Sequence, residues 1–522
     1  MFTTTLPRFF IHPTRAIPAL RSSAAFSTRP VARSSVLSSK LKNHDLLKHK
    51  SYVNGEWVGS SSSRTFAVND PATGEEIGRC PDMNLGDLGK AIEAATESFS
   101  RYRHSTPAVR QSYLRKFNGL ILANAEDLAR LIVAENGKSW KDALGEVNYA
   151  ASFVDWFAEE ALRTDGIIVP SSTPAVRHLV IKQPIGVVAA LCPWNFPAAM
   201  ITRKVAPALA AGCSVIVKAP AETPLTALAL AELANQAGFP AGVFNIITTQ
   251  SATPEIGKAL CEHEEIRKLS FTGSTGVGKL LMAQSSSTLK KLSLELGGNA
   301  PFIVFEDADV DKAVEGAMAC KFRCAGQACV SANRFYVHQS IYAEFASKLT
   351  KKVSELKVGS GFEEGTSIGP LIDERSLEKV TRHVRLAREA GGEVLIGGKR
   401  VDGPGYFFLP TVLSEVPRGV IDGEETFGPV AALYKFGGEA EVVAAANKSE
   451  VGLAGYFYSK DIGRIWRVAE ALEVGMVGAN TGMVSNAVTP FGGIKHSGFG
   501  REGSKFGIEE FQTVKYIAMG GL

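Results

Sequence analysis

Three polar residues, each close to glycine or proline, have the chemistry needed to act on a carbonyl group. Cys329 ends the segment 326–329 (Gly-Gln-Ala-Cys), which follows a predicted helix. A thiolate can attack an aldehyde carbon, but a free thiol with a pKa of about 8.5 needs a base or an electropositive surrounding to ionise at neutral pH. The alternative role for Cys329 is that of a small buried apolar side chain, and its glycine-rich loop favours the reactive role.

Glu295 and Asn195 are the other two candidate groups. Glu295 ends an apolar run and is followed by Leu296 and two glycines. An apolar setting raises the pKa of a carboxyl group toward the range of a general base. Asn195 lies in the rigid segment 193–197 (Pro-Trp-Asn-Phe-Pro), where its amide could donate a hydrogen bond to a developing oxyanion. Each residue also has a structural alternative, as the polar end of a strand or as part of a turn.

A glycine-rich segment, 271–278 (Phe-Thr-Gly-Ser-Thr-Gly-Val-Gly), follows a predicted strand and opens a predicted helix. Glycines let a phosphate approach the backbone, and a helix N-terminus offers free N–H groups and a positive dipole end. The spacing G-x-x-G-x-G differs from the usual G-x-G-x-x-G. A dinucleotide site and a structural turn with Ser274 as the N-cap residue are therefore both open at this point.

Three cysteines close in sequence, Cys320, Cys324 and Cys329, could suggest a metal site. Their spacing lacks a fourth nearby Cys or His and matches no zinc or iron–sulfur ligand pattern. The sequence therefore predicts no metal. Cys320 and Cys324 are four residues apart on a predicted helix, so at least one of them is expected in the core.

Alternating strands and helices must position these residues. Between His178 and Glu295, short β-branched runs alternate with longer helical ones, which predicts a parallel sheet covered on both faces. A second α/β unit is expected from about residue 300 to 495. The predicted strands are 178–181, 186–191, 213–218, 242–248, 269–272, 292–295 and 302–305; the predicted helices are 198–211, 223–238, 253–263, 274–284, 309–323 and 341–356.

The composition is that of a soluble globular protein, with 522 residues of which 45% are hydrophobic and 21% charged. No run approaches the ~20 apolar residues of a membrane span, so no membrane association is predicted. Residues 1–44 contain no acidic residue and seven of the 57 basic ones, which leaves 50 basic against 53 acidic residues in the rest. The basic excess therefore belongs to the N-terminal segment and does not indicate nucleic-acid binding.

The N-terminal segment is rich in Arg, Ser and Thr with scattered apolar residues, a pattern typical of a mitochondrial transit peptide. A disordered basic tail is the alternative. We expect a leader over residues 1–40, a location in the mitochondrial matrix, and a packed fold that begins near Ser51. The odd number of cysteines, seven, follows no disulfide framework and favours a reducing compartment.

The order of the motifs is more specific than any one of them. In this order, they resemble those of the NAD(P)-dependent aldehyde dehydrogenase superfamily, and the resemblance covers residues 50–522. Around Arg203, the segment 321–323 and the C-terminal part, the chain is most similar to mitochondrial members that act on succinate semialdehyde. The motifs that carry the resemblance are Trp194-Asn195, Lys218, Gly273–Gly278, Glu295-Leu296-Gly297-Gly298, Gly326-Gln327-x-Cys329, Glu425-Thr426-Phe427-Gly428-Pro429 and Pro490-Phe491-Gly492-Gly493.

The resemblance implies a role for each motif residue. Cys329 would attack the aldehyde, Asn195 and the Cys329 N–H would hold the oxyanion, and Glu295 would activate the water that hydrolyses the thioester. NAD or NADP would be bound by Trp194, Lys218, Ala221, Gly273, Ser274, Gly278, Glu425 and Phe427.

The resemblance also implies a substrate pocket formed by Arg203, Arg323 and Ser485. A distal carboxylate needs such a cationic, hydrogen-bonding partner, and a guanidinium group offers a two-pronged one. The expected reaction is oxidation of succinate semialdehyde to succinate, as in 4-aminobutyrate degradation.

Several alternatives to this reaction are open. The substrate could be glutarate semialdehyde or an uncharged aliphatic aldehyde. Acyl transfer to coenzyme A is another reaction of such enzymes, and Glu295 argues against it. From another class, the chain could be a catalytically silent binding protein on this scaffold, which the intact Cys329, Glu295 and Asn195 disfavour.

Two departures from the pattern of similar enzymes bear on regulation and on the cofactor. Where many read Lys-Pro-Ala-Glu, this chain has Ala221 three residues after Lys218 and a carboxylate only at Glu222, which leaves NAD versus NADP preference open. Ser331 replaces a cysteine that forms a regulatory disulfide in some relatives. Cys324, where many relatives have Asn, is the candidate for a substitute.

The expected architecture is an α/β fold of the aldehyde dehydrogenase type. A Rossmann-type cofactor domain would span residues 50–165 and 186–296, and an α/β catalytic domain residues 297–497. A small oligomerisation element would combine residues 166–185 and 498–522. The resemblance implies a homodimer or homotetramer that acts on a small aldehyde, with no nucleic-acid partner.

Overall fold

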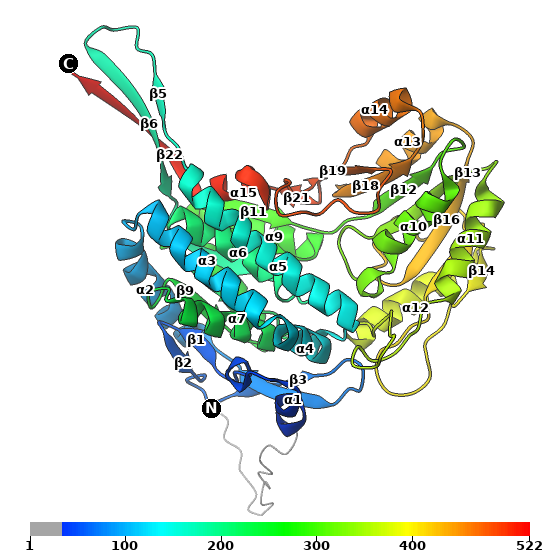
Figure 1. The fold of residues 1–522 in the computed structure, drawn as a ribbon, viewed down its shortest axis with the longest axis horizontal. Coiled ribbons are helices and arrows are strands. Elements are labelled where there is room, and N and C mark those ends of the chain that lie inside the picture. Colours follow the sequence, from blue (N-terminus) through cyan, green and yellow to red (C-terminus); the bar gives the residue numbers. More distant parts are fainter. Residues whose placement is uncertain (1–33, 522) are drawn as a thin grey trace, which may run out of the picture.

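Two large β-sheets organise the computed structural model, which describes residues 34–521 (Figure 1). The first sheet has eight strands in the order β2-β1-β9-β8-β7-β10-β11-β21. Its strands are β1 (Ser51–Val53), β2 (Glu56–Val58), β7 (Val187–Leu191), β8 (Ser214–Lys218), β9 (Phe244–Ile247), β10 (Ile266–Thr272), β11 (Lys291–Glu295) and β21 (Gly498–Phe499).

The five central strands of the first sheet, β9-β8-β7-β10-β11, are parallel. The chain winds outward from β7 in one direction through β8 and β9, then returns to continue on the other side with β10 and β11. This reversal of strand order creates a crevice at the carboxyl ends of β7 and β10, where ligands bind in open parallel sheets. Every residue of β7 and β8 is buried, as expected for central strands covered on both faces.

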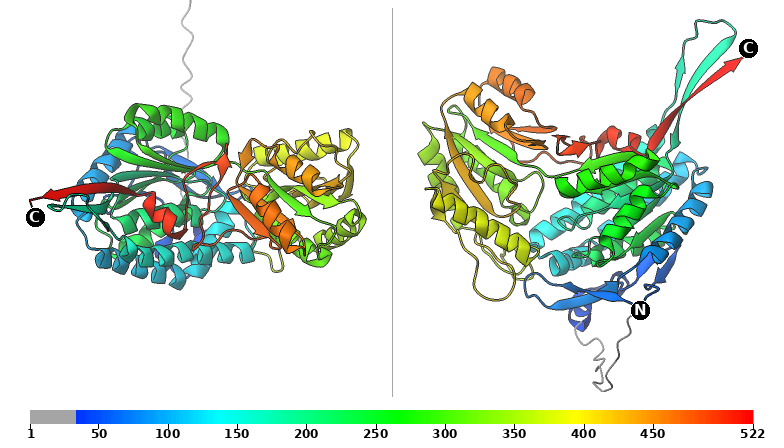
Figure 2. Two further views of the ribbon diagram at one scale, coloured as in Figure 1. Left: turned by 90° about the horizontal axis from the view of Figure 1, so that it is seen from above. Right: turned by 180° about the vertical axis from the view of Figure 1, so that it is seen from behind.

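Helices cover both faces of the first sheet. Helices α6 (Ala199–Ala211) and α7 (Pro224–Ala237) lie on one face, beneath α3 (Pro107–Ala123), α4 (Ala125–Asn136) and α5 (Trp140–Glu160). Helices α2 (Leu85–Tyr102), α8 (Thr253–Glu262) and α9 (Thr275–Ser285) lie on the other face. The view from behind shows α8 and α9 in green over the sheet (Figure 2).

The second sheet has seven strands in the order β14-β15-β16-β13-β12-β18-β19, and all but β14 run parallel. It lies beside the first sheet and is linked to it by residues 296–299 (Figure 2, left). Its strands are β12 (Ala300–Val304), β13 (Ala332–His338), β14 (Glu393–Ile396), β15 (Thr411–Ser414), β16 (Val430–Phe436), β18 (Ala454–Tyr458) and β19 (Met476–Ala479); its helices are α10 (Val310–Lys321), α11 (Tyr342–Ser354), α12 (Glu374–Glu389), α13 (Glu439–Asn447) and α14 (Ile462–Ala471).

A three-stranded antiparallel sheet extends away from the rest of the molecule (Figure 1). It consists of β5 (Ile167–Val169), β6 (Val176–Pro184) and β22 (Gln512–Gly520), and we call it the arm. The predicted strand 178–181 lies in the arm and not in the parallel sheet. Residues 498–511, which include β21 and α15 (Ser504–Glu509), pack against the first sheet and its helices α5 and α6 before the chain enters the arm.

Two small strand pairs lie outside these sheets: β3 (Thr65–Asn69) with β4 (Glu76–Pro81), and β17 (Val451–Gly452) with β20 (Ile494–Lys495). Within the described part of the chain, no helix is both long and apolar enough to span a bilayer.

The packed structure begins earlier than the expected start near Ser51. Helix α1 (Ser34–Lys40) packs against α4, and Leu37 and Leu41 are 3% and 4% exposed. The Lys42 N–H donates to Asp127 Oδ1 at 3.0 Å, which fixes the chain after the helix. The absence of acidic residues up to His44 makes the segment that contains α1 resemble a leader peptide, but its leucines are core residues. A leader that ended at residue 40 would take Leu37 with it; residues 1–33 lie outside the described part.

Candidate active site

The carboxyl ends of four parallel strands bring the predicted residues of the first sheet to one edge. Leu191 at the end of β7 pairs with Lys218 and with Phe271, and Thr272 pairs with Glu295 at the end of β11. The segment 193–195 and the pair Gly273-Ser274 follow directly, so both lie in the crevice between β7 and β10.

The second sheet contributes a strained loop in front of β13. The predicted helix 309–323 is too long: α10 ends at Lys321, and a short 3-10 helix (Arg323–Gly326) follows. Cys324, Ala325 and Gly326 have φ of 52°, 53° and 73°, a left-handed conformation that costs on the order of 1–3 kcal/mol for each non-glycine residue. The placement of Cys324 on a helix with Cys320 was therefore wrong, although both side chains are buried.

Contacts from three parts of the chain hold this loop in place. Asp142, in the first turn of α5, accepts the Cys324 N–H at 2.9 Å. The Gln327 side chain accepts the Ile372 N–H at 3.0 Å, and the Gln327 carbonyl accepts a hydrogen bond from Asn195 Nδ2 at 3.0 Å. The loop therefore brings Cys329 into the same cavity lining as Asn195 from the first sheet.

Cys329 lies between two cavities. One cavity, of about 360 Å³, is lined by residues of α5, α6 and the strained loop and by residues 483–491. The other, of about 250 Å³, is lined by residues that follow β7 and β10 and by residues 425–427. We call them the inner cavity and the cofactor-side cavity. Of the described residues, Cys329 and Met200 line both.

The inner cavity contains all three predicted substrate residues, Arg203, Arg323 and Ser485, together with Cys329. The two arginines differ in their partners. Arg203 is 1% exposed, forms an ion pair with Glu502, and lies 4.1 Å from the centroid of the Phe491 ring. The nearby Glu502 carboxylate raises the pKa of Arg203 further despite its burial. The charge of Arg203 is therefore already compensated within the protein.

Arg323 has no such partner. Among the described residues it forms no ion pair, and its one hydrogen bond is donated to the Met483 sulfur at 3.6 Å. Against the effect of burial, the nearby Cys324 and Asp142 raise its pKa. Its guanidinium lies 6.0 Å from the centroid of the Phe196 ring. A cation of this kind on a cavity wall is available to an anionic ligand.

Tyr149 is a polar residue of the inner cavity that sequence reasoning missed. Its hydroxyl forms a hydrogen bond with Ser485 Oγ, and its ring packs edge-on against Phe153 with centroids 4.8 Å apart. Tyr149 is among the groups that raise the pKa of Arg203 and the pKa of Arg323, so the phenol lies near both guanidinium groups. Nothing in the sequence marked Tyr149, because its contact with Ser485 joins residues 336 positions apart in the chain.

The cofactor-side cavity collects five of the eight predicted cofactor residues: Trp194, Gly273, Ser274, Glu425 and Phe427. Trp194 and Phe427 face each other edge-on, with ring centroids 5.7 Å apart. Burial raises the pKa of Glu425 to about 7. Ser274 is also the N-cap residue of α9, and its side chain accepts the Val277 N–H at 3.4 Å. The same residue therefore caps the helix and lines the cavity.

Lys218, Ala221 and Gly278 do not line this cavity. Lys218 is buried at the end of β8, and burial lowers its pKa. Gly278 lets α9 approach Leu296, because a Cβ at this position would lie 2.4 Å from Leu296 Cδ2. Lys379 of α12 lines the cavity and was not predicted, because nothing in a charged amphipathic helix marks one lysine as inward-facing.

Glu295 is 2% exposed and lies outside the residues that line either cavity. Both of its carboxyl oxygens are without a hydrogen-bond partner in the described part of the chain. Burial, followed by the charge of Glu502, holds its pKa well above the ordinary value. Burial therefore favours the neutral form of the Glu295 carboxyl group and strengthens the affinity of its carboxylate for a proton.

Burial also raises the pKa of the Cys329 thiol, to about 12, and the positive charge of Arg203 offsets this only in part. The thiol is thus protonated in the structure without ligands. Ionisation requires a proton acceptor or a change of surroundings when ligands bind.

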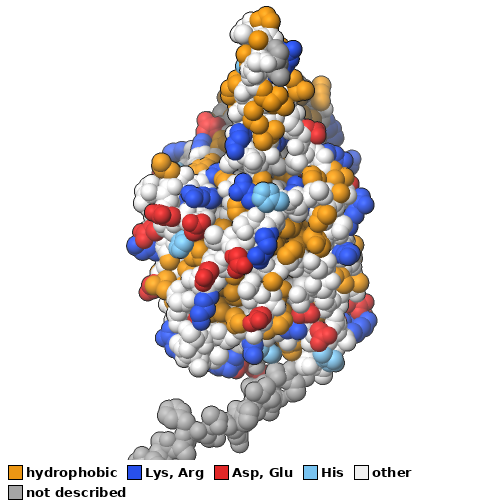
Figure 3. Space-filling model, turned by 90° about the vertical axis from the view of Figure 1, so that its left-hand side faces the viewer, with side chains coloured by type: hydrophobic (Ala, Val, Ile, Leu, Met, Phe, Trp, Pro, Cys, Tyr) orange, Lys and Arg blue, Asp and Glu red, His pale blue; other side chains and the backbone are white. Residues whose placement is uncertain are grey.

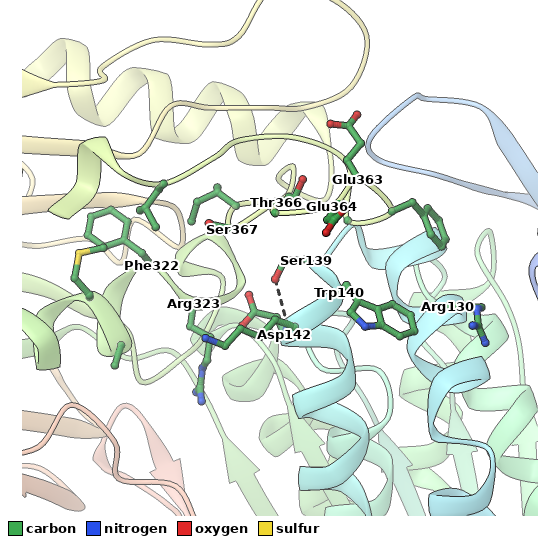
Figure 4. Close-up of a pocket in the computed structure, with 18 of the residues that line it drawn as sticks. Arg130, Ser139, Trp140, Asp142, Phe322, Arg323, Glu363, Glu364, Thr366 and Ser367 are labelled. Atoms are coloured by element: carbon green, nitrogen blue, oxygen red, sulfur yellow. Dashed lines mark hydrogen bonds between the residues drawn. The ribbon is translucent and has the colours of Figure 1, made fainter.

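A third and larger cavity, of about 930 Å³, adjoins the inner cavity and is not lined by Cys329 (Figure 4). We call it the outer cavity. It shares Lys141, Asp142, Arg323 and Met483 with the inner cavity. In the described part of the chain, no three or more His, Cys, Asp or Glu side chains form a group that could hold a metal ion.

The amino-acid sequence matches the model of the aldehyde dehydrogenase family over residues 57–517. Among curated relatives, succinate-semialdehyde dehydrogenase [NADP(+)] 1 of Schizosaccharomyces pombe is 54% identical, over 94% of this chain and 100% of the relative. Glutarate-semialdehyde dehydrogenase of Pseudomonas putida is 52% identical, over 92% and 99%.

A mitochondrial relative and a solved structure are also similar. The mitochondrial succinate-semialdehyde dehydrogenase of Rattus norvegicus is 50% identical, over 97% of this chain and 98% of the relative. The crystal structure of succinate-semialdehyde dehydrogenase from Burkholderia pseudomallei is 52% identical and superimposes with a TM-score of 0.91, over 92% of this chain and 100% of that one.

Proposed function

The chain belongs to the aldehyde dehydrogenase family, and from this premise we propose that it oxidises succinate semialdehyde to succinate with NAD(P)⁺. The predicted α/β fold of the aldehyde dehydrogenase type is confirmed by the solved relatives. The family acts on aldehydes with NAD(P)⁺, so the proposal concerns the substrate and the part that each residue plays.

The observation that carries the substrate proposal is Arg323. It is a cation without a carboxylate partner in the described structure, on the wall of the cavity that holds Cys329. A distal carboxylate would replace the weak sulfur acceptor with two charge-assisted hydrogen bonds. Tyr149 and Ser485 supply hydroxyl groups in the same cavity. The names of the yeast and rat relatives agree with an ω-carboxylate aldehyde.

Cys329 is the proposed nucleophile. The thiol loses its proton to solvent, its sulfur forms a bond to the aldehyde carbon, and the electrons of the carbonyl π bond move to the oxygen, which becomes an oxyanion. Asn195 Nδ2, which lies against the Cys329 loop, and the Cys329 N–H donate hydrogen bonds to this oxygen. The low-dielectric surroundings that raise the thiol pKa also strengthen these hydrogen bonds.

The cofactor-side cavity suits a nicotinamide and its ribose. It offers the Glu425 carboxyl group for ribose hydroxyls, aromatic rings at Trp194 and Phe427, and the start of α9 for phosphate groups. When bound there, NAD(P)⁺ supplies the hydride acceptor on the side of Cys329 opposite the inner cavity. The remaining cofactor residues, Lys218, Ala221 and Gly278, are proposed to act beyond this cavity, at the adenosine end.

Glu295 is the proposed general base of the second half-reaction. As the carboxylate, it takes a proton from the water that attacks the thioester at Cys329; the carbon–sulfur bond then breaks, which releases succinate and the Cys329 thiolate. A carboxyl group with a raised pKa is a stronger proton acceptor, which suits this task. Since Glu295 lies behind the cavity walls, its side chain must turn toward Cys329 to act. A water-activating base of this kind disfavours transfer of the acyl group to coenzyme A.

A steady-state assay tests the proposal. Reduced cofactor is measured with succinate semialdehyde, glutarate semialdehyde and butyraldehyde, each with NAD⁺ and NADP⁺. We expect kcat/KM for succinate semialdehyde to exceed that for uncharged butyraldehyde, which has the same number of carbons. Equal values would refute the carboxylate site while leaving the family reaction intact. A preference for glutarate semialdehyde, the substrate in the name of the bacterial relative, would move the assignment to that aldehyde.

The arm is proposed to serve assembly into a homodimer or homotetramer. We propose the cofactor domain as residues 50–165 and 186–296, the catalytic domain as 297–497, and the oligomerisation element as 166–185 with 498–522. The arm exposes apolar side chains on a sheet with open edges (Figure 3), including Ile168 at 76%, Val514 at 70% and Tyr516 at 59%. Such a surface is typical of an interface. Light scattering tests this by measuring the molar mass of the assembly in solution. We expect a lower molar mass for the double variant Ile168→Lys, Val514→Lys than for the parent.

A mitochondrial matrix location is proposed on the acid-free N-terminal segment and on the name of the rat relative. Because Leu37 is a core residue, the leader is proposed to end before it. A fluorescent protein fused after residue 36 should enter mitochondria, and a fusion in which Arg8, Arg15, Arg21, Arg29 and Arg33 are replaced by Gln should not.

A further inference from the structure

Met483 stands at the junction of the inner and outer cavities. It follows β19 in an irregular segment that also carries Ser485, and its side chain is 45% exposed. It lines both cavities, together with Lys141, Asp142 and Arg323. Lys141 and Asp142 belong to the first turn of α5, which Ser139 caps by accepting the Asp142 N–H at 3.2 Å (Figure 4). Of the four junction residues, Met483 is thus the one outside a helix.

The Met483 sulfur accepts the hydrogen bond of Arg323 that a carboxylate would take. Arg323 Nη1 donates to it at 3.6 Å. A thioether is a weak acceptor, whereas a carboxylate forms short, charge-assisted and two-pronged hydrogen bonds with a guanidinium. Displacing the sulfur therefore costs little, and the unbranched methionine side chain can adopt another rotamer within the open outer cavity.

We propose that Met483 is a specificity-determining residue that limits the length of the substrate. Its thioether holds the place of the distal carboxylate on Arg323 until substrate arrives, and its side chain closes the inner cavity beyond Arg323. Short ω-carboxylate aldehydes, whose carboxylate ends at Arg323, are accepted. Longer ones would have to extend into the volume that Met483 fills. This inference rests on the proposed function, since it presumes an anionic aldehyde in the inner cavity.

The remaining walls of the junction do not offer the same control. Arg323 opens the strained loop and is held by the Cys324 contact to Asp142, so its backbone is fixed. Asp142 is in turn fixed by that hydrogen bond and by the cap of α5. Shortening Met483 should therefore merge the inner cavity with the 930 Å³ outer one, without releasing the loop that carries Cys329.

The test compares Met483→Ala with Met483→Leu, which keeps the volume but removes the sulfur. Glu363→Gln, in the outer cavity only, is the matched control. kcat/KM is measured for succinate, glutarate and adipate semialdehydes and for butyraldehyde, with Tm as a check on folding. In Met483→Ala we expect the succinate-to-glutarate ratio to fall about tenfold, in the range that one methylene group contributes in a pocket. Met483→Leu and Glu363→Gln should keep the parental ratio.

An unchanged ratio in Met483→Ala, with Tm preserved, would overturn the inference. So would an equal change of the ratio in Met483→Leu, because the sulfur and not the length of the side chain would then be responsible. Failure of the proposed function is distinguishable, since it appears in the parent enzyme as equal kcat/KM for succinate semialdehyde and butyraldehyde. The inhibition constants of succinate, glutarate and adipate provide a second measurement of the same length limit. This measurement does not require turnover of the longer aldehydes.

Discussion

Replacing Arg323 by Gln separates substrate recognition from catalysis. Glutamine keeps a polar side chain that can donate to the Met483 sulfur, but it removes the positive charge. Arg323 forms no ion pair within the described structure, and Asp142, whose charge raises the Arg323 pKa, keeps the hydrogen bond from the Cys324 N–H when Arg323 is replaced. The variant should therefore fold normally, and its defect should depend on the charge of the substrate.

The magnitude follows from the contacts that Arg323 can make. Hydrogen bonds to a charged group contribute about 1.5–3 kcal/mol, and a two-pronged guanidinium–carboxylate pair lies in the upper part of this range. The expected loss in kcat/KM for succinate semialdehyde is thus about 10- to 150-fold. The loss should appear mainly in KM, because the distal carboxylate is bound equally in the ground state and in the transition state. Butyraldehyde, which lacks the carboxylate, should lose little.

The assay measures kcat and KM for both aldehydes in the parent, in Arg323→Gln and in Arg323→Lys. Lysine keeps the charge but loses the two-pronged geometry, so it should fall between the other two. A loss of similar size for both aldehydes would refute the reasoning, since it would show that Arg323 supports the Cys329 loop and not the carboxylate. An unaffected KM for succinate semialdehyde would refute it as well.

Four further outcomes are expected. Arg203→Gln should destabilise the protein by about 3–5 kcal/mol, because it leaves the buried Glu502 without one of its cations; a Tm equal to that of Arg323→Gln would contradict this. Glu295→Gln should retain a stoichiometric burst of reduced cofactor but lose steady-state turnover by at least about 100-fold, seen by stopped-flow absorbance; loss of the burst would assign Glu295 to the first step. Alkylation of Cys329 by iodoacetamide in the ligand-free enzyme should rise with pH without a plateau up to pH 10, because the neutral thiol is favoured below a pKa of about 12; a plateau near pH 8 would show an ionised thiol. Leu37→Ala should lower the free energy of unfolding by about 2–5 kcal/mol by chemical denaturation, and an unchanged value would return the start of the fold to Ser51.

Local patterns in the sequence predicted the five parallel strands of the first sheet and its helices α6 to α9, but not α2 to α5 or the strands β1, β2 and β21. Apolar runs bounded by glycines gave β7 and β8 nearly to the residue, because central parallel strands are apolar on both faces. The end of α10 was missed because nothing in its composition shows that Cys324 adopts a left-handed conformation. That conformation depends on Asp142, which is 182 residues away in the chain.

Contacts between distant residues account for what was missed at the site. Cys329 and most of the predicted substrate and cofactor residues line the two cavities, whereas Glu295, Lys218, Ala221 and Gly278 lie outside both linings. The partners of these residues were not predicted. Glu502, which compensates Arg203, is 299 residues further along the chain, and Tyr149 reaches Ser485 across 336 residues. Pairing of this kind is a property of the folded chain, and a single sequence carries no signal for it.

The position of Cys329 in the wall between two cavities has a consequence for how enzymes of this architecture diversify. Of the described residues, Met200 and Cys329 alone belong to both linings. Substitutions on one side can therefore accumulate without disturbing the other, so that the choice of aldehyde and the choice of dinucleotide are separable traits. Relatives about 50% identical to this chain carry the names of succinate- and glutarate-semialdehyde dehydrogenases. Because the aldehyde and the dinucleotide would reach the same thiol through different cavities, substitutions can change the specificity for one of them while the reaction at Cys329 is retained.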